Sequence, residues 1–220
     1  MPATTLALTI EPSHGSCERQ LTSCNNRLDI LDLAIRQKKE HFAGGNQPLF
    51  KGKVLGMIFQ KPSLRTRVSF DMAMRHMGGD ALYLSPNEIG LGKREAIADV
   101  SRVMSGYVQA VMARVFEHAH VVELAKYSSV PVVNGLSDFS HPCQAMADAL
   151  TIIEKFGTMK GVNVTYVGDG NNVAVSLMHI VVMLGGNFTI ANPASYDMPD
   201  VAKKTGTGLA AKSGARIMYL

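Results

Sequence analysis

Residues 53–79 have the sequence KVLGMIFQKPSLRTRVSFDMAMRHMGG, and this stretch decides the fold that we predict. Its first part, residues 53–59, is almost entirely apolar, which is typical of a strand buried on both faces. Apolar residues then recur at a spacing of three and four up to Gly78-Gly79, which predicts an amphipathic helix that ends there. A strand, a polar turn and a helix in this order form the first half of a βαβ unit.

Strand-like and helix-like segments alternate along the rest of the chain. Further strands are expected at 81–85, 108–114, 130–134, 162–168, 188–192 and 216–220, and further helices at 28–42, 97–107, 121–128, 142–156 and from the 168–172 loop to Gly185. This alternation predicts an α/β fold of parallel sheets with helices packed on both faces.

The chain has 220 residues, and a domain usually has roughly 100–200. We expect two parallel-sheet α/β domains, one at 1–156 with an irregular leader at 1–25, and one at 157–220. The second holds about three strands and two helices and ends inside an apolar strand, while parallel sheets usually have more strands. We therefore expect the second domain to be incomplete in this chain.

Composition excludes several classes of protein. Hydrophobic residues make up 46% and charged residues 18%, which is typical of a globular chain and not of a disordered one. The net charge is only +4, the basic residues are scattered and Trp is absent, so no nucleic-acid interface is expected. The longest apolar stretch, Val173–Leu184, is too short to span a bilayer, so we expect no membrane span.

Cysteine usage and the N-terminus indicate a cytoplasmic protein. Cys17, Cys24 and Cys143 are odd in number and lack a CxxC spacing, which predicts neither a disulfide framework nor a zinc site. Residues 1–20 lack the basic start and apolar core of a signal peptide.

Residues 61–67, KPSLRTR, form a polar turn between the first strand and its helix. The N–H groups and positive dipole end of that helix would face an anion. Ser63 and Thr66 add hydroxyl donors, and Arg65 can bind phosphate oxygens with two hydrogen bonds. Because arginine at a helix start opposes the dipole, an anion is expected here. The alternative is an ordinary N-cap at Ser63 with exposed arginines.

A second polar junction, His141-Pro142-Cys143-Gln144, stands at the start of the predicted 142–156 helix. His141 and Gln144 are three residues apart and can contact one small ligand, and histidine can donate to a carbonyl oxygen that gains charge. A thiol nucleophile at Cys143 is disfavoured because no base with an orienting partner is visible beside it. The alternative for His141 is an ordinary loop histidine.

Arg114 ends the predicted 108–114 strand. Ligands of open α/β sheets bind beyond the carboxyl ends of the strands. We therefore expect Arg114, the 61–67 turn and the 141–144 junction to face one crevice. The alternative for Arg114 is a surface ion pair with Glu117 or Glu123.

Residues 168–172, GDGNN, follow a predicted strand and resemble half of a dinucleotide-binding fingerprint. Val173 occupies the third glycine position, and Asn192 stands where a ribose-binding acid is expected, so a nicotinamide-dependent oxidoreductase is a minor alternative. The asparagine side chains can instead bind the carboxylate or amine of an amino acid. The loop can also be a simple turn.

From about residue 28 to the end of the chain, these motifs resemble those of the carbamoyltransferase family. SLRTR (63–67) is similar to the family's S-T-R-T-R loop, ARVF (113–116) to its strand-end arginine, and NGLSDFSHPCQAMAD (134–148) to its H-P-x-Q segment. H-P-C-Q together with VGDGNN (167–172) is closer to the ornithine branch than to the aspartate branch.

The resemblance implies a role for each matching residue. Ser63, Arg65, Thr66 and the backbone of Leu64 would hold the phosphate of carbamoyl phosphate, Arg114, His141 and Gln144 its carbamoyl group, and Asn172 with Asn171 the ornithine. Arg65, Arg114 and His141 would be catalytic. The resemblance also implies that no metal or cofactor is needed, and that the protein is a homotrimer or larger homo-oligomer.

The chain departs from the family pattern in three places. Leu64 stands where the family usually has Thr, and Gly90 stands where many members have Gln or His. The sequence also ends before the family's later ornithine-binding loop and its His-Cys-Leu-Pro segment.

The activity implied is transfer of a carbamoyl group from carbamoyl phosphate to the δ-amino group of L-ornithine, giving L-citrulline and phosphate. It would serve arginine biosynthesis or arginine and citrulline metabolism. Acetylornithine, succinylornithine and putrescine stay open as acceptors. The alternative from another class is a non-catalytic, truncated chain that at most binds carbamoyl phosphate.

Overall fold

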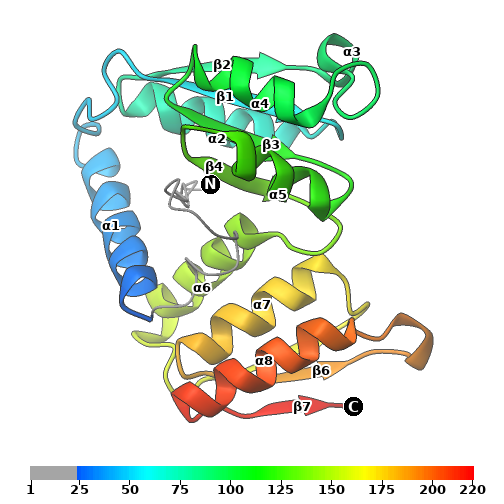
Figure 1. The fold of residues 1–220 in the computed structure, drawn as a ribbon. Coiled ribbons are helices and arrows are strands. Elements are labelled where there is room, and N and C mark those ends of the chain that lie inside the picture. The colour runs from blue at the N-terminus through cyan, green and yellow to red at the C-terminus, as the bar shows by residue number, and fades with distance from the viewer. Residues whose placement is uncertain (1–23) are drawn as a thin grey trace. The chain divides into compact units, whose positions relative to one another are not determined.

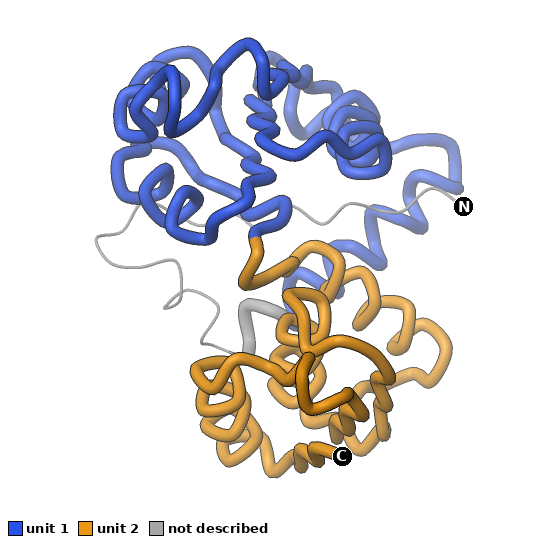
Figure 2. The backbone as a smooth tube through the Cα atoms, turned by 90° about the vertical axis from the view of Figure 1, so that its right-hand side faces the viewer, with its two compact units in different colours: residues 1–137 blue, residues 138–220 orange. Residues whose placement is uncertain are grey.

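The computed structural model describes residues 24–220, which divide into two compact units (Figures 1 and 2). The first unit ends at Ser137 and the second runs from Asp138 to Leu220. Of the predicted leader at 1–25, residues 1–23 lie outside the described residues, Cys17 among them, and Cys24 begins the first helix.

The first unit is a parallel four-stranded sheet with the strand order β2-β1-β3-β4. Its strands are β1 (Val54–Phe59), β2 (Asp80–Leu84), β3 (Ala110–Arg114) and β4 (Val132–Leu136). Its helices are α1 (Cys24–Phe42), α2 (Leu64–His76), α3 (Pro86–Ile89), α4 (Ile97–Ser105) and α5 (His118–Tyr127).

The strand order fixes which helix covers which face of this sheet. The crossover from β1 to β2 runs in one direction, and the crossovers from β2 to β3 and from β3 to β4 run in the other. Because such crossovers are right-handed, α2 lies on one face and α4 with α5 on the opposite face (Figure 1). The chain after β1 and the chain after β3 therefore diverge, which is the switch point where open α/β sheets bind ligands.

The core of the first unit surrounds the two central strands. Met57 in β1 and Met112 in β3 are fully buried, as the apolar run at 53–59 predicts. Cε of Met104 from α4 packs over Gly56, where a Cβ atom would lie 2.4 Å from it.

The second unit is a parallel three-stranded sheet with the order β5-β6-β7. Its elements are α6 (Pro142–Phe156), β5 (Asn163–Val167), α7 (Asn172–Met183), β6 (Asn187–Ala191), a 3-10 turn at Ala194–Tyr196, α8 (Asp200–Ser213) and β7 (Ile217–Tyr219). The buried helix α7 packs against both α6 and α8.

The predicted α/β class with parallel sheets is confirmed, but helices on both faces are seen only in the first unit. In the second unit each successive strand extends the same edge of the sheet. Right-handed crossovers therefore put α7 and α8 on one face of it (Figure 1). Side chains along β5 alternate accordingly: Val164 and Tyr166 are half-buried, while Val167 is 79% exposed.

Several element bounds differ from the prediction. The domain boundary at 156/157 stays a prediction, while the compact units divide at Ser137/Asp138 and α6 packs on α7. Helix α5 begins at His118 and not at residue 121, and the predicted helix ranges include neither α3 nor α8. Within the described part of the chain, no helix combines the length and apolar character needed to cross a membrane.

Candidate functional site

The N-terminus of α2 is built from the predicted 61–67 turn. Ser63 is the N-cap residue in extended conformation, and its Oγ accepts from the backbone N–H of Thr66 (3.4 Å) and donates to Oγ1 of Thr66 (3.1 Å). The first turn of α2 holds no acidic side chain, and Arg65 lies within it. The predicted cap and the predicted basic turn are therefore both present, with the positive end of the helix dipole uncompensated by protein.

Arg114 joins this turn from the neighbouring strand. It is the last residue of β3 and lies beside Phe59, the last residue of β1. Its Nη1 donates to Oγ1 of Thr66 (3.3 Å), so the structure brings Arg114 and the α2 turn together, as predicted. The alternative ion pair with Glu117 is not formed, since the Glu117 carboxylate instead faces Nε2 of His120 at 3.8 Å.

The electrostatics of Arg114 favour a bound anion. Its Nε is buried and has no hydrogen-bond partner among residues 24–220. Burial and, next, the positive charge of Arg65 lower the pKa of Arg114 below its ordinary value. Arginine stays protonated in proteins, so this shift reflects a partly buried positive charge and, next, the like charge of Arg65. A bound anion would offset both costs.

We call Ser63, Leu64, Arg65, Thr66 and Arg114 the anion site. Leu64 is the first residue of α2 and is 77% exposed, and its backbone N–H is one of the free N–H groups at the helix start. The register of β3 against β4 shifts between Ala113 and Arg114. The extra residue is Gly135 of β4, because Ala113 pairs with Asn134 and Arg114 with Leu136.

One polar residue at this edge was not predicted. Gln60 follows β1 directly, and its backbone N–H donates to the carbonyl of Arg114 (2.8 Å). Its position, a polar residue immediately after a buried strand, is the only sequence signal that could have drawn attention to it.

The predicted 141–144 junction lies in the second unit, where His141 caps α6 and Pro142 occupies its first turn. The His141 backbone N–H donates to Oγ of Ser176 (2.8 Å), and that hydroxyl donates to the carbonyl of Asn172 (2.9 Å). Within this unit, the structure therefore links the start of α6 to the first turn of α7.

Gln144 and Cys143 occupy different environments in the first turn of α6. Gln144 is exposed, and its Nε2 donates to Oδ1 of Asp148 (2.9 Å). Burial raises the pKa of the Cys143 thiol to about 12, so the thiol stays protonated at neutral pH. This agrees with the expectation that Cys143 is not a nucleophile.

The GDGNN loop is shaped by contacts inside the second unit. Asn171 is the N-cap of α7, and its Oδ1 accepts from the backbone N–H groups of Val173 (3.0 Å) and Ala174 (3.2 Å). A Cβ atom at Gly170 would lie 2.4 Å from the backbone nitrogen of Met198. Close packing of two loops therefore explains why residue 170 is a glycine. The glycine does not require a bound nucleotide phosphate as its explanation.

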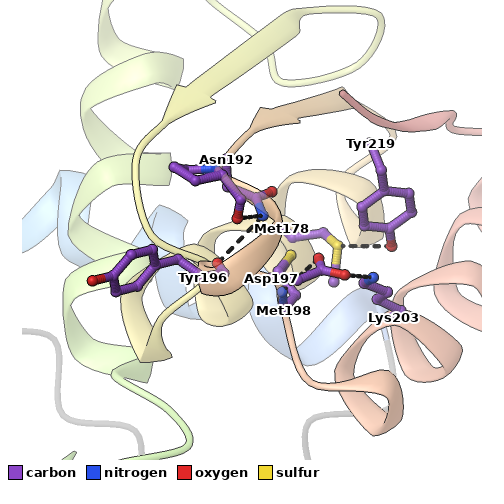
Figure 3. Close-up of polar contacts among 8 residues, drawn as sticks. Met178, Asn192, Tyr196, Asp197, Met198, Lys203 and Tyr219 are labelled. Carbon is purple, nitrogen blue, oxygen red and sulfur yellow. Dashed lines mark hydrogen bonds and ion pairs between the residues drawn. The ribbon is translucent and has the colours of Figure 1, made fainter.

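The loop after β6 is also held by its own polar groups (Figure 3). Asn192, which stands at the ribose-acid position of the dinucleotide pattern, donates from Nδ2 to the carbonyls of Pro193 (3.2 Å) and Tyr196 (3.3 Å). Asp197 forms an ion pair with Lys203. The contacts of Asn192 are therefore those of a turn, which gives the oxidoreductase alternative no support.

Comparison with known proteins covers both units. Residues 20–154 match the carbamoyl-phosphate-binding domain of the aspartate/ornithine carbamoyltransferases, and residues 160–219 match the Asp/Orn-binding domain. These limits leave α6 with the first domain, as the sequence-based boundary does, although it packs with the second unit.

Individual relatives give the same result. Ornithine carbamoyltransferase of Pyrococcus abyssi is 55% identical over 191 residues, which are 87% of this chain and 60% of that protein. The enzyme of Bacillus subtilis is 52% identical over 171 residues, 78% of this chain and 54% of that protein. The chain thus spans about 60% of the length of the ornithine carbamoyltransferases of Pyrococcus species that it matches.

Solved structures are similar as well. Ornithine carbamoyltransferase from Pyrococcus furiosus superimposes with a TM-score of 0.91 at 49% identity, covering 98% of this chain and 67% of that one. An N-acetyl-L-ornithine transcarbamylase matches with a TM-score of 0.77 at 29% identity, covering 91% of this chain and 68% of that one. Since the two domain models together match most of its length, the chain belongs to the aspartate/ornithine carbamoyltransferase family.

Proposed function

We propose that the protein transfers the carbamoyl group of carbamoyl phosphate to the δ-amino group of L-ornithine, giving L-citrulline and phosphate. The observation that supports this most directly is the anion site, in which two arginines, two hydroxyls and a helix N-terminus adjoin one strand end. Family membership supports the chemistry, and the 49–55% identity to ornithine carbamoyltransferases supports the acceptor.

In this proposal the anion site binds the phosphate of carbamoyl phosphate. The hydroxyls of Ser63 and Thr66 and the backbone N–H of Leu64 donate to phosphate oxygens, and Arg65 binds the same oxygens with its guanidinium. Arg114, His141 and Gln144 bind the carbamoyl group, as the H-P-C-Q motif of the family supports.

The reaction proceeds by direct attack of the deprotonated δ-amine on the carbonyl carbon. A C–N bond forms, the C–O bond to phosphate breaks, and the proton lost by the amine is taken up by the departing phosphate. Arg65, Arg114 and His141 stabilise the oxyanion that develops on the carbonyl oxygen, and the anion site stabilises the departing phosphate. Binding the two substrates with the amine oriented toward the carbonyl carbon supplies much of the rate enhancement.

We propose that Asn172 and Asn171 bind ornithine at the start of α7. Amide side chains can bind both a carboxylate and an amine. Asn171 combines this with its capping role, in which only its Oδ1 is used by the backbone. The structural likeness to an N-acetyl-L-ornithine transcarbamylase keeps acetylornithine as the acceptor to test against ornithine.

We further propose that the protein is a cytoplasmic homotrimer of arginine biosynthesis, with carbamoyl phosphate and ornithine as its partners. The similar enzyme of Pyrococcus furiosus bears the name anabolic ornithine carbamoyltransferase. Self-association is also supported by α2, where Leu64, Val68 and Met72 expose apolar side chains at a spacing of four residues.

A thermal-shift titration tests the binding half of this proposal. Carbamoyl phosphate at about 100 times its Kd should stabilise the folded chain by roughly 2.7 kcal/mol. Sulfate at equal ionic strength and NAD serve as controls and should give smaller shifts. A shift with NAD alone would favour the oxidoreductase alternative.

Citrulline formation tests the transfer half. Ornithine, acetylornithine, succinylornithine and putrescine are supplied in parallel with carbamoyl phosphate, and ornithine should give the highest rate. A chain that binds carbamoyl phosphate and carbamoylates none of the four would support the alternative of a carbamoyl-phosphate-binding protein without turnover.

A further inference from the structure

Gln60 lies where the two central strands of the first unit separate. Its backbone N–H donates to the carbonyl of Arg114 (2.8 Å), the last bond between β1 and β3. Beyond it, the chain after β1 turns into the anion site at Ser63 and α2, and the chain after β3 turns toward α5. The Gln60 side chain is therefore placed between segments that leave the sheet in opposite directions.

The Gln60 amide bridges these segments through both of its polar atoms. Oε1 accepts from the backbone N–H of Phe116 (3.0 Å), and Nε2 donates to the carbonyl of Leu91 (3.0 Å). Because one partner is a donor and the other an acceptor, they fix the orientation of the amide. Nδ1 of His120 in α5 lies 3.1 Å from Nε2 and 3.2 Å from Oε1.

These bonds hold the backbone at Arg114 and directly after it. The Arg114 carbonyl is bound by the Gln60 backbone, and Phe116, two residues further on, is bound by the Gln60 side chain. The Arg114 side chain has a single long hydrogen bond to the α2 turn, 3.3 Å to Thr66. Its direction therefore depends on a backbone that Gln60 fixes.

We propose that Gln60 is a positioning residue of the anion site: its amide oxygen holds the chain after β3 so that Arg114 faces the first turn of α2. Gln60 does not touch the ligand in this proposal. The inference rests on the proposed function only for the identity of the anion, carbamoyl phosphate.

The same strand pair offers a matched control at its opposite end. Gln109 precedes β3, and its Oε1 accepts from the backbone N–H of Val54 (2.8 Å), while its own N–H donates to the carbonyl of Val54 (3.0 Å). Gln109 thus uses its amide to bridge β1 and β3, as Gln60 does, but at the amino ends of the strands.

The experiment compares Gln60→Leu, Gln109→Leu and Gln60→Glu with the native chain. Each is titrated calorimetrically with carbamoyl phosphate and with inorganic phosphate, and the melting temperature of each is recorded. We expect Gln60→Leu to weaken the binding of each anion about tenfold or more, which is the effect of roughly one lost hydrogen bond. Gln109→Leu should lower the melting temperature similarly and leave both affinities close to native.

Gln60→Glu separates positioning from a general loss of structure. Its carboxylate still accepts from the Phe116 N–H but cannot donate to Leu91. We expect it to recover most of the affinity that Gln60→Leu loses. If Gln60→Glu binds as weakly as Gln60→Leu, or if the two leucine variants bind alike, the positioning role is overturned.

The two anions distinguish this inference from the proposed function. Phosphate binding that depends on Gln60, without any binding of carbamoyl phosphate, would support the inference and overturn the proposed function. A native chain that binds neither anion would overturn both.

Discussion

Burial and, next, the positive charge of Arg65 lower the pKa of Arg114, and the proposed anion would relieve both costs. Replacing Arg65 with alanine should lower the affinity for carbamoyl phosphate about 100-fold, since two charge-assisted hydrogen bonds contribute roughly 1.5 kcal/mol each. Arg67→Ala is the matched control, because the Arg67 guanidinium lies over the ring of Tyr83, 3.9 Å from its centroid. Calorimetric titration should show a near-native affinity for Arg67→Ala, and equal losses in both variants would contradict the role of Arg65.

Cys143 should be unreactive in the folded protein. With a pKa of about 12, about one thiol in 10,000 is ionised at pH 8. In a variant with Cys17→Ser and Cys24→Ser, iodoacetamide should therefore label Cys143 rapidly in denaturant and very slowly without it. Rapid labelling of the native protein would reopen the possibility of a nucleophile.

Asp148 should give the protein a pH-dependent stability. Burial raises its pKa, and the hydrogen bond from Gln144 opposes the shift. A raised pKa in the folded state means that folding favours the protonated form, so stability falls as pH rises from the ordinary pKa through the raised one. Asp148→Asn should therefore unfold at higher urea concentration than the native chain at pH 7. The difference should shrink as pH is lowered toward 4, and a constant difference would contradict this origin.

Side-chain chemistry in the sequence predicted that the α2 turn and Arg114 lie together, but it did not predict the contacts that support them. Ser63, Arg65 and Arg114 could be chosen because they follow strands or begin helices, where ligands bind. The bond between Arg114 and Thr66 and the amide contacts of Gln60 join residues 31 to 56 positions apart. No local pattern encodes such pairings, because they arise only when the strands are in register.

At the scale of elements, the loops that follow β5 and β6 are packed without spare room. Gly170→Ala would place a Cβ atom 2.4 Å from a backbone nitrogen, so the loop at Met198 must shift, at a cost of about 1–3 kcal/mol. Gly208 in α8 is the control, because a Cβ atom there meets nothing within 4 Å. Gly208→Ala should stabilise the protein by roughly 0.5–1 kcal/mol. Urea unfolding measures both changes, and a neutral Gly170→Ala would show that the loop can move freely.

Elements with a strong apolar period were predictable, and weakly patterned ones were not. The bounds 142–156 for α6 agree with the structure because Pro142 and Gly157 mark its ends in the sequence. Helix α5 was started three residues late because its first turn, His118-Ala119-His120, has no apolar stripe. The short α3 depends on a capping box at Ser85 and Glu88 rather than on burial.

At the scale of the whole molecule, the proposed trimer should have a mass of about 71 kDa, three times the 23.7 kDa of one chain. Sedimentation equilibrium measures it directly. Val68→Glu, which puts a charge on the exposed stripe of α2, should reduce the mass if this stripe is the contact. A native mass of one chain would contradict the trimer.

The order of strands along the chain has a consequence for synthesis on the ribosome. Every strand of the first sheet lies before residue 137, so β1, β2, β3 and β4 can pair while the remainder is still being translated. The 84 residues after Leu136 take roughly 4–17 s at about 5–20 residues per second. Mixed α/β domains usually fold within roughly milliseconds to seconds. The nascent chain therefore has time to bring Arg114 to the α2 turn while residues 137–220 are being translated.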